Sequence, residues 1–475
     1  MSFPSPSHSP RRCGAVSEKY RREHFPTLAD LGVNRREFLQ RTGMGFGALS
    51  LAWLLGANSA AAQTAPAGKP RAPLAPRPPH FPAPAKAVIH IFAKGGPSQV
   101  DTWDPKPALL KYAGKTIEGH DGLVFPSPFK FSKHGQAGTE VSELFPRLGG
   151  CVDDMAVIRS IWTDIPAHDV AQRFWTTGSL QMPAPSMGSW VVYGLGTENQ
   201  NMPGFITLGG KPEARQASFL PGVFEGCNVN YTHGMRLDQV LLNIRNEFTG
   251  LERQRRQLDL ARKLNEIHAA ALQRDAQLES RIETFEMAFK MQTEATDAFD
   301  LSKESAETRA LYGETDMGGK MLIARRLIER GVRFVQVEHD GWDSHSNLAS
   351  SIPLLAETID RPAAALLQDL KQRGLLASTL VLWGGEFGRA IVRDRNGNEG
   401  GPGRDHNARA SVAWMAGGGV KAGIVHGATD ELGDRAVEGK VHIHDLHATV
   451  LALLGFDHTK LTHHYNGRDL CLTDT

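Results

Sequence analysis

Cysteine and net charge are both scarce in this sequence: its 475 residues include four cysteines and carry a formal net charge of +1. Beyond Cys13, the cysteines are odd in number and widely spaced, at Cys151, Cys227 and Cys471. They predict neither a disulfide framework nor a zinc–thiolate site. The balanced charge gives no sign of a nucleic-acid surface. The 41% apolar content and the 49 glycines fit a loop-rich globular protein of one large or two medium domains.

The N-terminal region also lacks a hydrophobic run long enough for a membrane anchor. Its apolar stretch, residues 42–55, contains three glycines. At about 14 residues it is shorter than the ~20 that a spanning helix requires. The stretch follows Arg35 and Arg36 and precedes three alanines that end at Ala62, an order that resembles a twin-arginine signal peptide. We therefore expect residues 1–62 to be a signal peptide that engages the twin-arginine translocase, a periplasmic or otherwise exported protein, and no stable membrane span.

The remaining chain alternates between buried-strand and helix patterns. Residues 63–85 are rich in proline and alanine and indicate an extended linker without a core of its own. Apolar runs at 87–93, 155–160, 332–337, 379–383 and 411–416 predict strands, and residues 318–330 and 353–373 predict helices. Residues 251–296 contain neither proline nor glycine. They indicate one or two long amphipathic helices, inserted at about 240–310 and packed on the sheet. The pattern predicts an α/β protein with a mostly parallel sheet.

Three clusters of acidic residues and histidine lie beside predicted strands. Asp343 and His345 follow the strand at 332–337, Glu386 follows the strand at 379–383, and Asp405 and His406 precede the strand at 411–416. Loops at the carboxyl ends of parallel strands are where ligands bind in open α/β sheets. Carboxylate and imidazole groups together are suitable ligands for zinc, manganese or iron. The clusters predict a metal site, against the alternative of solvated loop charges.

Five segments in order carry a resemblance to a known family. They are residues 94–107 (KGGPSQVDTWDPKP), 341–345 (GWDSH), 385–389 (GEFGR), 403–406 (GRDH) and 445–455 (DLHATVLALLG). Together they resemble the alkaline phosphatase-like superfamily of phosphatases and sulfatases, and within it the exported, sulfatase-like family called domain of unknown function 1501. The resemblance covers residues 86 to 474. It implies a three-layer α/β/α domain with a mostly parallel central sheet and a helical insertion.

The resemblance also implies a ligand set and a cofactor. Superfamily members hold metal ions between strand ends, so one or two divalent ions, zinc, manganese or calcium, are expected. The residues that match the ligand positions are Asp343, His345, Glu386 and His406, with Asp101 or Asp104 as the acidic ligand after the first strand. Asp405 would complete the first metal site, because Phe387 stands where the superfamily has a histidine ligand.

A second departure concerns the nucleophile. Where sulfatases and phosphatases carry a serine, threonine or cysteine, this chain has His168. Three interpretations of His168 stay open: a phosphoryl-accepting nucleophile, an additional metal ligand in a site where water attacks, or a hydrogen-bonded loop histidine in a protein without catalysis.

Two functions from different classes follow. The first is a metal-dependent hydrolase of phosphate or sulfate esters, with Arg389 or Arg404 holding the anion of a small-molecule or polysaccharide substrate. The second is a non-catalytic sulfatase-like binding protein. For either arginine alone, an ion pair with Asp405 or Glu386 is an equally good expectation. A further histidine group, His442, His444 and His447, flanks Asp445, which is expected to cap a helix rather than to bind metal.

Overall fold

The structure, a computed structural model, describes residues 73–180, 183–241, 250–271, 276–294, 296–395 and 401–473. The predicted signal segment and the first part of the predicted linker lie outside these residues. The described residues all belong to one unit of the chain, Asn58–Thr475.

A nine-stranded sheet forms the centre of this unit, in the order β12-β4-β11-β8-β1-β7-β5-β6, with β15 paired to β4. Every strand runs in the same direction except β11, which is antiparallel to both β4 and β8. The bounds are β1 Ala87–Lys94, β4 Met155–Trp162, β5 Phe205–Leu208, β6 Cys227–Val229, β7 Phe334–Asp340, β8 Thr379–Gly384, β11 Ser411–Ala416, β12 Ile424–His426 and β15 Val441–His442.

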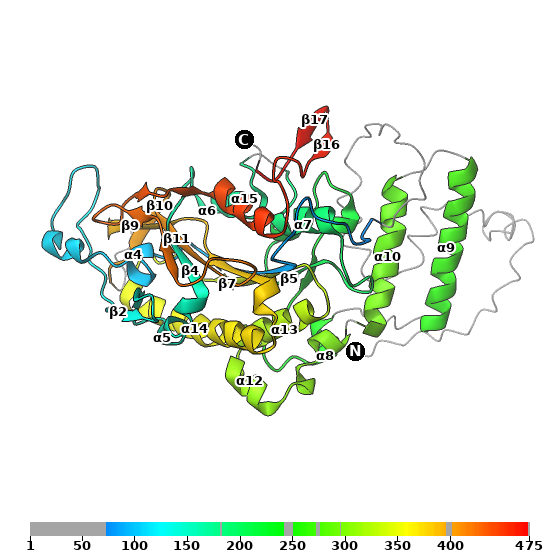
Figure 1. The fold of residues 1–475 in the computed structure, drawn as a ribbon, viewed down its shortest axis with the longest axis horizontal. Helices are drawn as coiled ribbons and strands as arrows, with labels where there is room; N and C mark the ends of the chain where they lie inside the picture. The colour runs from blue at the N-terminus through cyan, green and yellow to red at the C-terminus, as the bar shows by residue number, and fades with distance from the viewer. Residues whose placement is uncertain are drawn as a thin grey trace, which may run out of the picture. The chain divides into compact units, whose positions relative to one another are not determined.

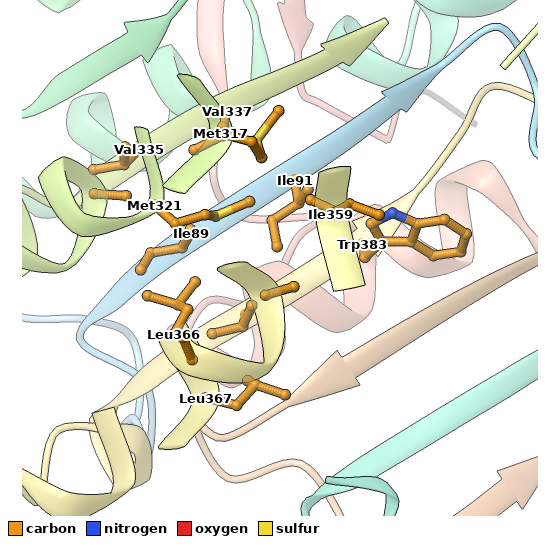
Figure 2. Close-up of a cluster of buried hydrophobic side chains, with 14 of the residues drawn as sticks. Ile89, Ile91, Met317, Met321, Val335, Val337, Ile359, Leu366, Leu367 and Trp383 are labelled. Carbon is orange, nitrogen blue, oxygen red and sulfur yellow. The ribbon is translucent and has the colours of Figure 1, made fainter. Parts of the chain in front are cut away.

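Helices cover both faces of the sheet, because its central strands are apolar on both sides. Alternate residues of β1 enter different cores: Ile89 and Ile91 pack with α13 (Asp316–Glu329) and α14 (Leu348–Gln372). Figure 2 shows this core, where Met321 and Leu366 meet the strands. Val88 and Phe92 pack on the opposite side with α6 (His168–Thr177), α7 (Met187–Leu195) and α15 (Ile443–Leu453). The two helix layers are visible in Figure 1. The three-layer α/β/α fold and mostly parallel sheet are confirmed.

Small hairpins and short helices fill the connections. The hairpins pair β2 (Phe131–His134) with β3 (Thr139–Ser142), β9 (Gly388–Arg393) with β10 (Arg404–Asn407), β13 (Ala428–Thr429) with β14 (Ala436–Glu438), and β16 (His463–Tyr465) with β17 (Arg468–Leu470). The short helices are α4 (Gln99–Thr102), α5 (Pro146–Gly149), α8 (Leu237–Val240), α11 (Thr296–Phe299) and α12 (Ala306–Tyr312).

The predicted insertion forms two long helices, α9 (Leu251–Ala271) and α10 (Ala276–Glu294), which lie side by side (Figure 1). The pair is held on the domain through α10. Met291 is buried in the core with α13, and the Lys290 ammonium donates a hydrogen bond to the Gln200 carbonyl at 3.0 Å. Among the described residues, no helix combines the length and the apolar character needed to cross a membrane.

The described part of the predicted linker, residues 73–85, packs on the domain. Leu74 and Ala85 are buried in the core that includes α7 and α15. The Arg77 guanidinium donates to the Tyr193 carbonyl at 2.6 Å and lies 5.7 Å from the Tyr193 ring centroid. Apolar and cationic side chains between the prolines therefore attach this segment to the domain.

Candidate metal centre

Four potential metal ligands from distant parts of the chain meet at one edge of the sheet. Asp343 and His345 follow β7, His168 begins α6 after β4, and His406 lies in β10, just before β11. Because β4, β7 and β8 are parallel and β11 is antiparallel, their connections all reach the same edge. One donor atom from each of His168, Asp343, His345 and His406 lies within 4.8 Å of every other. The structure brings these four sequence-predicted residues together, His168 among them.

The Asp343 carboxylate is the centre of this group. Its Oδ1 lies 3.1 Å from His168 Nε2, 2.9 Å from His345 Nε2 and 3.4 Å from His406 Nε2. The Nε2 atoms of His345 and His406 are themselves 2.9 Å apart. Three imidazole nitrogens and one carboxylate oxygen therefore point into one small volume.

The other ring nitrogen of each histidine is bound to a protein acceptor. Nδ1 of His168 donates to Glu386 Oε1 at 2.7 Å, Nδ1 of His345 to Asp394 Oδ2 at 2.5 Å, and Nδ1 of His406 to the Pro166 carbonyl at 2.7 Å. Carboxylates and carbonyls only accept, so each Nδ1 carries a proton, which leaves Nε2 as the nitrogen that can bind a metal once it is deprotonated. This is the usual arrangement around metal-bound histidine.

The donor arrangement fits a cation. His168 Nε2 is buried and makes no hydrogen bond of normal geometry, although Asp343 Oδ1 is 3.1 Å away. In their deprotonated forms, the three Nε2 atoms and the Asp343 carboxylate are converging donors, and a divalent cation would satisfy all of them. Three nitrogens and one oxygen form a donor set that suits a tetrahedral ion such as zinc.

The close approach of charged groups shifts the pKa values of His168 and Asp343. Burial lowers the pKa of His168, but the neighbouring Asp343 and Glu386 carboxylates outweigh burial and raise that pKa to about 9. Burial raises the pKa of Asp343, but His168, His406 and Arg389 outweigh it and hold that pKa far below its usual range. Asp343 is therefore ionised at any physiological pH.

Arg389 is fully buried and is placed to hold Asp343 rather than a substrate anion. Its Nη2 donates to Asp343 Oδ1 at 2.5 Å and to the Gly95 carbonyl, its Nε to the Gly96 carbonyl at 2.9 Å, and its Nη1 to the Arg404 carbonyl at 3.1 Å. The predicted anion-binding role is not supported, because every nitrogen of the guanidinium is engaged by the protein.

Asp101 and Arg404 form a buried pair outside the metal group. Arg404 donates from Nε to Asp101 Oδ2 at 2.7 Å and from Nη2 to Oδ1 at 3.1 Å, and its guanidinium lies 4.6 Å from the Phe125 ring centroid. Both side chains are fully buried. The structure therefore contradicts the prediction that Asp101 is a ligand and that Arg404 binds the anion. Asp104, the alternative acidic ligand, lies 3.1 Å from the Lys106 ammonium and accepts from Thr429.

Glu386 and Asp405 lie next to the group without joining it. Glu386 is buried and accepts from the Gly95 amide at 2.9 Å and from Gln172 at 2.9 Å, in addition to His168. It orients a candidate ligand instead of being one. Asp405 Oδ1 accepts from the His406 amide at 2.7 Å and lies 4.0 Å from His345 Nδ1. With His345 and Asp394 it forms a second, more peripheral group.

Sequence reasoning missed three of these contributors: Asp394, the Pro166 carbonyl and the Gly95 turn. Asp394 directly follows β9, a position that a search of strand ends could have found. Gly95 has a φ of +113°, and a Cβ there would lie 2.5 Å from the Asp343 amide nitrogen. The backbone can approach Asp343 this closely only because residue 95 is glycine.

Phe387 fills the space beside two candidate ligands. Its ring is fully buried, with its centroid 4.9 Å from that of His168 and 4.6 Å from that of His406. Among the described residues, none of the four candidate ligand side chains has a hydrogen bond to a serine, threonine or cysteine side chain.

The second histidine group does not form a metal site in the described residues. His442 caps α15 and lies 2.9 Å from Asp164, while Asp445, at the third helical position, accepts from the His442 amide at 2.8 Å. His447 Nε2 donates to the Trp175 carbonyl at 2.8 Å. The prediction that Asp445 is the cap was wrong, since His442 takes that position and Asp445 closes the capping box.

The fold and the site define a three-layer α/β protein with a candidate metal centre at the carboxyl edge of its sheet. The chain belongs to the family described as "Protein of unknown function (DUF1501)", whose model matches residues 85–475. This confirms the family expected from the sequence. No curated protein matches the sequence.

The solved structures that resemble this chain include sulfatases and alkaline phosphatases. The PsFucS1 sulfatase from Pseudoalteromonas sp. is 12% identical, with coverage of 78% of this chain and 68% of that chain and a TM-score of 0.35. The alkaline phosphatase from the Antarctic bacterium TAB5 is 9% identical, with coverage of 79% and 99% and a TM-score of 0.34. The lipoteichoic acid synthase LtaP from Listeria monocytogenes is 11% identical, with coverage of 81% and 76% and a TM-score of 0.34. Such distant likenesses support no conclusion about activity, substrate or metal.

Proposed function

We propose that this protein is an exported, metal-dependent hydrolase of phosphate or sulfate esters. The observation that carries the proposal is the convergence of three imidazole Nε2 atoms and the Asp343 carboxylate, with every Nδ1 bound to an acceptor. A histidine that only stabilises a fold has no need of this arrangement, whereas a metal ligand does.

The donor set favours one zinc-like ion over the wider choice that the sequence allowed. Calcium prefers six to eight oxygen ligands, and this group offers three nitrogens and one oxygen. Zinc, manganese and iron accept such a mixture. A second ion beside His345 would have to displace the Nδ1 proton that bonds Asp394, so one ion is the simpler occupancy.

The residues of the chain supply binding and orientation. A bound divalent ion would polarise an ester oxygen and lower the pKa of a bound water. Arg389 fixes the Asp343 carboxylate, and Glu386, held by the Gly95 amide and Gln172, fixes the His168 ring. The Asp343 side chain is 45% exposed and His345 is 35% exposed, so the centre is open to a small-molecule or polysaccharide ester from solvent.

A non-catalytic binding protein is the alternative, and two observations favour it. Arg389 and Arg404 are committed to protein groups, and in the described part of the chain no hydroxyl or thiol side chain is hydrogen-bonded to the four candidate ligands. Such a protein would bind the ion and an ester without hydrolysing it.

The experiment compares three chromogenic esters with the same leaving group: p-nitrophenyl sulfate, bis-p-nitrophenyl phosphate and p-nitrophenyl phosphate. We expect the zinc-loaded protein to hydrolyse at least one of them, and both chelation and His345→Ala to abolish the activity. His464→Ala, an exposed histidine on β16, is the matched control and should retain it. A metal-loaded, folded protein that hydrolyses none of the three would contradict the hydrolase and favour the binding protein.

Export is proposed with the function. The segment around Arg35 and Arg36 supports passage through the twin-arginine translocase, which carries folded proteins, and a metal centre assembled from residues 168 to 406 requires a folded chain. The expected location is the periplasm or another compartment outside the cytoplasm.

A further inference from the structure

The charge around the candidate metal centre bears on which esters the site takes. Three carboxylates lie around the centre: Asp343 in direct contact with the buried Arg389, Glu386 at His168 Nδ1, and Asp405 4.0 Å from His345 Nδ1. The single positive charge of the Arg389 guanidinium is thus outnumbered by the negative charges of three carboxylates. With neutral imidazoles, as metal ligation requires, a divalent ion at most balances this group, and Asp394 at His345 Nδ1 adds a further carboxylate, so no surplus of positive charge remains.

Three further basic groups of the described residues near the site are also engaged. Arg404 forms a bidentate pair with Asp101. Lys94, at the end of β1, lies 3.6 Å from Glu338 and 3.4 Å from Asp340. Lys211 lies 3.6 Å from Asp169, the residue after His168. Each of these cations therefore already has a carboxylate partner in the protein.

The geometry points to a substrate with a single negative charge: we propose that the site takes sulfate esters or phosphodiesters and discriminates against dianionic phosphate monoesters. The second charge of a phosphate monoester would meet the exposed Asp405 and add to the negative charge of the buried Glu386, while the arginines and lysines named above already pair with carboxylates, and like charges repel. Sulfate esters and phosphodiesters share a tetrahedral centre with one negative charge. This inference rests on the proposed function, because it concerns the substrate of the same site.

The test measures binding, so that it does not depend on turnover. Zinc-loaded full-length protein is titrated calorimetrically with benzenesulfonate, diphenyl phosphate and phenylphosphonate. The first two carry one charge, and phenylphosphonate carries two at about pH 8, above a second pKa near 6 for phosphoryl groups. We expect at least one singly charged ligand to bind about tenfold more tightly than phenylphosphonate. Comparing benzenesulfonate with diphenyl phosphate shows which ester class the site prefers.

Two variants locate the effect. Asp405→Asn removes one negative charge beside His345 and should reduce the preference to about threefold or less. Asp469→Asn removes an exposed carboxylate on β17, which lies away from β9 and β10 (Figure 1), and should leave the preference unchanged.

Equal or tighter binding of phenylphosphonate in the unmodified protein, or no binding of any of the three ligands, would overturn the inference. The inference would also be overturned if Asp405→Asn and Asp469→Asn showed the same preference for singly charged ligands over phenylphosphonate. Failure of the proposed function gives a different result. If the protein prefers singly charged ligands but hydrolyses none of the p-nitrophenyl esters, the charge preference is supported and the proposed hydrolase activity is contradicted.

Discussion

Each imidazole of the candidate metal centre has one nitrogen bound to a protein acceptor and one facing the other donors. The acceptors are Glu386, Asp394 and the Pro166 carbonyl. Sequence position alone could place Asp343, His345 and His406 at the sheet edge, because all three flank strands. It could not separate Glu386, which orients a ligand, from the ligands themselves. That distinction depends on the Gly95 turn, which binds the Glu386 carboxylate.

The orienting role of Glu386 leads to a prediction at the residue scale. Glu386→Gln should weaken zinc binding about tenfold to a hundredfold, the usual cost of removing an outer partner of a metal-bound histidine, while leaving the four donors in place. Zinc affinity measured by competition with a chromogenic chelator tests this. Glu338→Gln, a buried carboxylate paired with Lys94, is the control and should bind zinc like the unmodified chain. Equal affinity of both variants would show that Glu386 does not orient His168.

The pKa of His168 predicts a pH dependence of metal binding. In the metal-free protein this pKa is raised to about 9 by Asp343 and Glu386, so His168 is protonated at neutral pH and the proton competes with the metal. Zinc affinity should therefore rise as the pH increases from 7 toward 9, and binding at pH 7 should release a proton. Calorimetry in buffers of different ionisation enthalpy measures that proton. Absence of proton release at pH 7 would contradict a ligand role for His168.

At the scale of elements, a buried ion network connects the end of the helical insertion to the domain. Arg325 of α13 is almost fully buried and lies 2.7 Å from Glu304, 2.6 Å from Glu329 and 3.0 Å from Asp369 of α14. The Tyr312 hydroxyl donates to Asp369 at 2.9 Å. Residues 296–312, which follow α10, are thereby fixed on α13 and α14.

Removal of Arg325 should destabilise the fold strongly. Arg325→Met removes one buried counter-charge from Glu304 and Asp369, which keep Arg326 and Arg373 as partners, so we expect a cost of about 2–3 kcal/mol, below that of an unpaired buried charge. The free energy of unfolding from urea denaturation tests this value. Arg256→Met is the control, because Arg256 and Glu252 form an exposed pair with nitrogen and oxygen 4.0 Å apart, and such pairs contribute about 0–1 kcal/mol. A similar effect of both substitutions would argue against the network.

The sequence predicted the strands better than the helix starts. β11 has the predicted bounds, because an apolar run buried on both faces is unambiguous. The helix predicted to begin at residue 353 begins instead at Leu348, since Pro353 lies inside α14 and does not start it. Proline fits the first turn of a helix and is costly further in, so the sequence favoured the later start. Packing of Leu348 and Ile352 into the core outweighs that cost.

For the whole molecule, the fold brings together residues separated by more than half of the described chain. His168 precedes seven of the nine strands of the sheet, and His406 follows six of them. The order of strands and helices and the mostly parallel sheet were predictable from the sequence. The convergence of the candidate metal ligands at one edge of the sheet followed from them. The engagement of Arg389 and Arg404 by buried partners was not predictable, because it depends on contacts with residues 95–101 that are distant in sequence.

Export is a prediction for the whole chain. Replacing Arg35 and Arg36 together with lysine should leave the uncleaved precursor inside the cell, because the paired arginines are the feature that the translocase reads. Immunoblotting of cell fractions measures this. The control is replacement of Arg21 and Arg22, an earlier arginine pair, which should leave export intact. Continued export of the Arg35/Arg36 double variant would refute the twin-arginine assignment.

The metal content of the purified protein tests the central claim most directly. Elemental analysis of the protein after extensive dialysis should find about one transition-metal ion per chain, with zinc as the best match to three imidazole nitrogens and one carboxylate. Asp343→Ala and His406→Ala should each reduce this content to a small fraction, while His464→Ala should retain it. A folded protein with far less than one ion per chain, or variants that retain their metal, would contradict the metal centre and with it the proposed hydrolase.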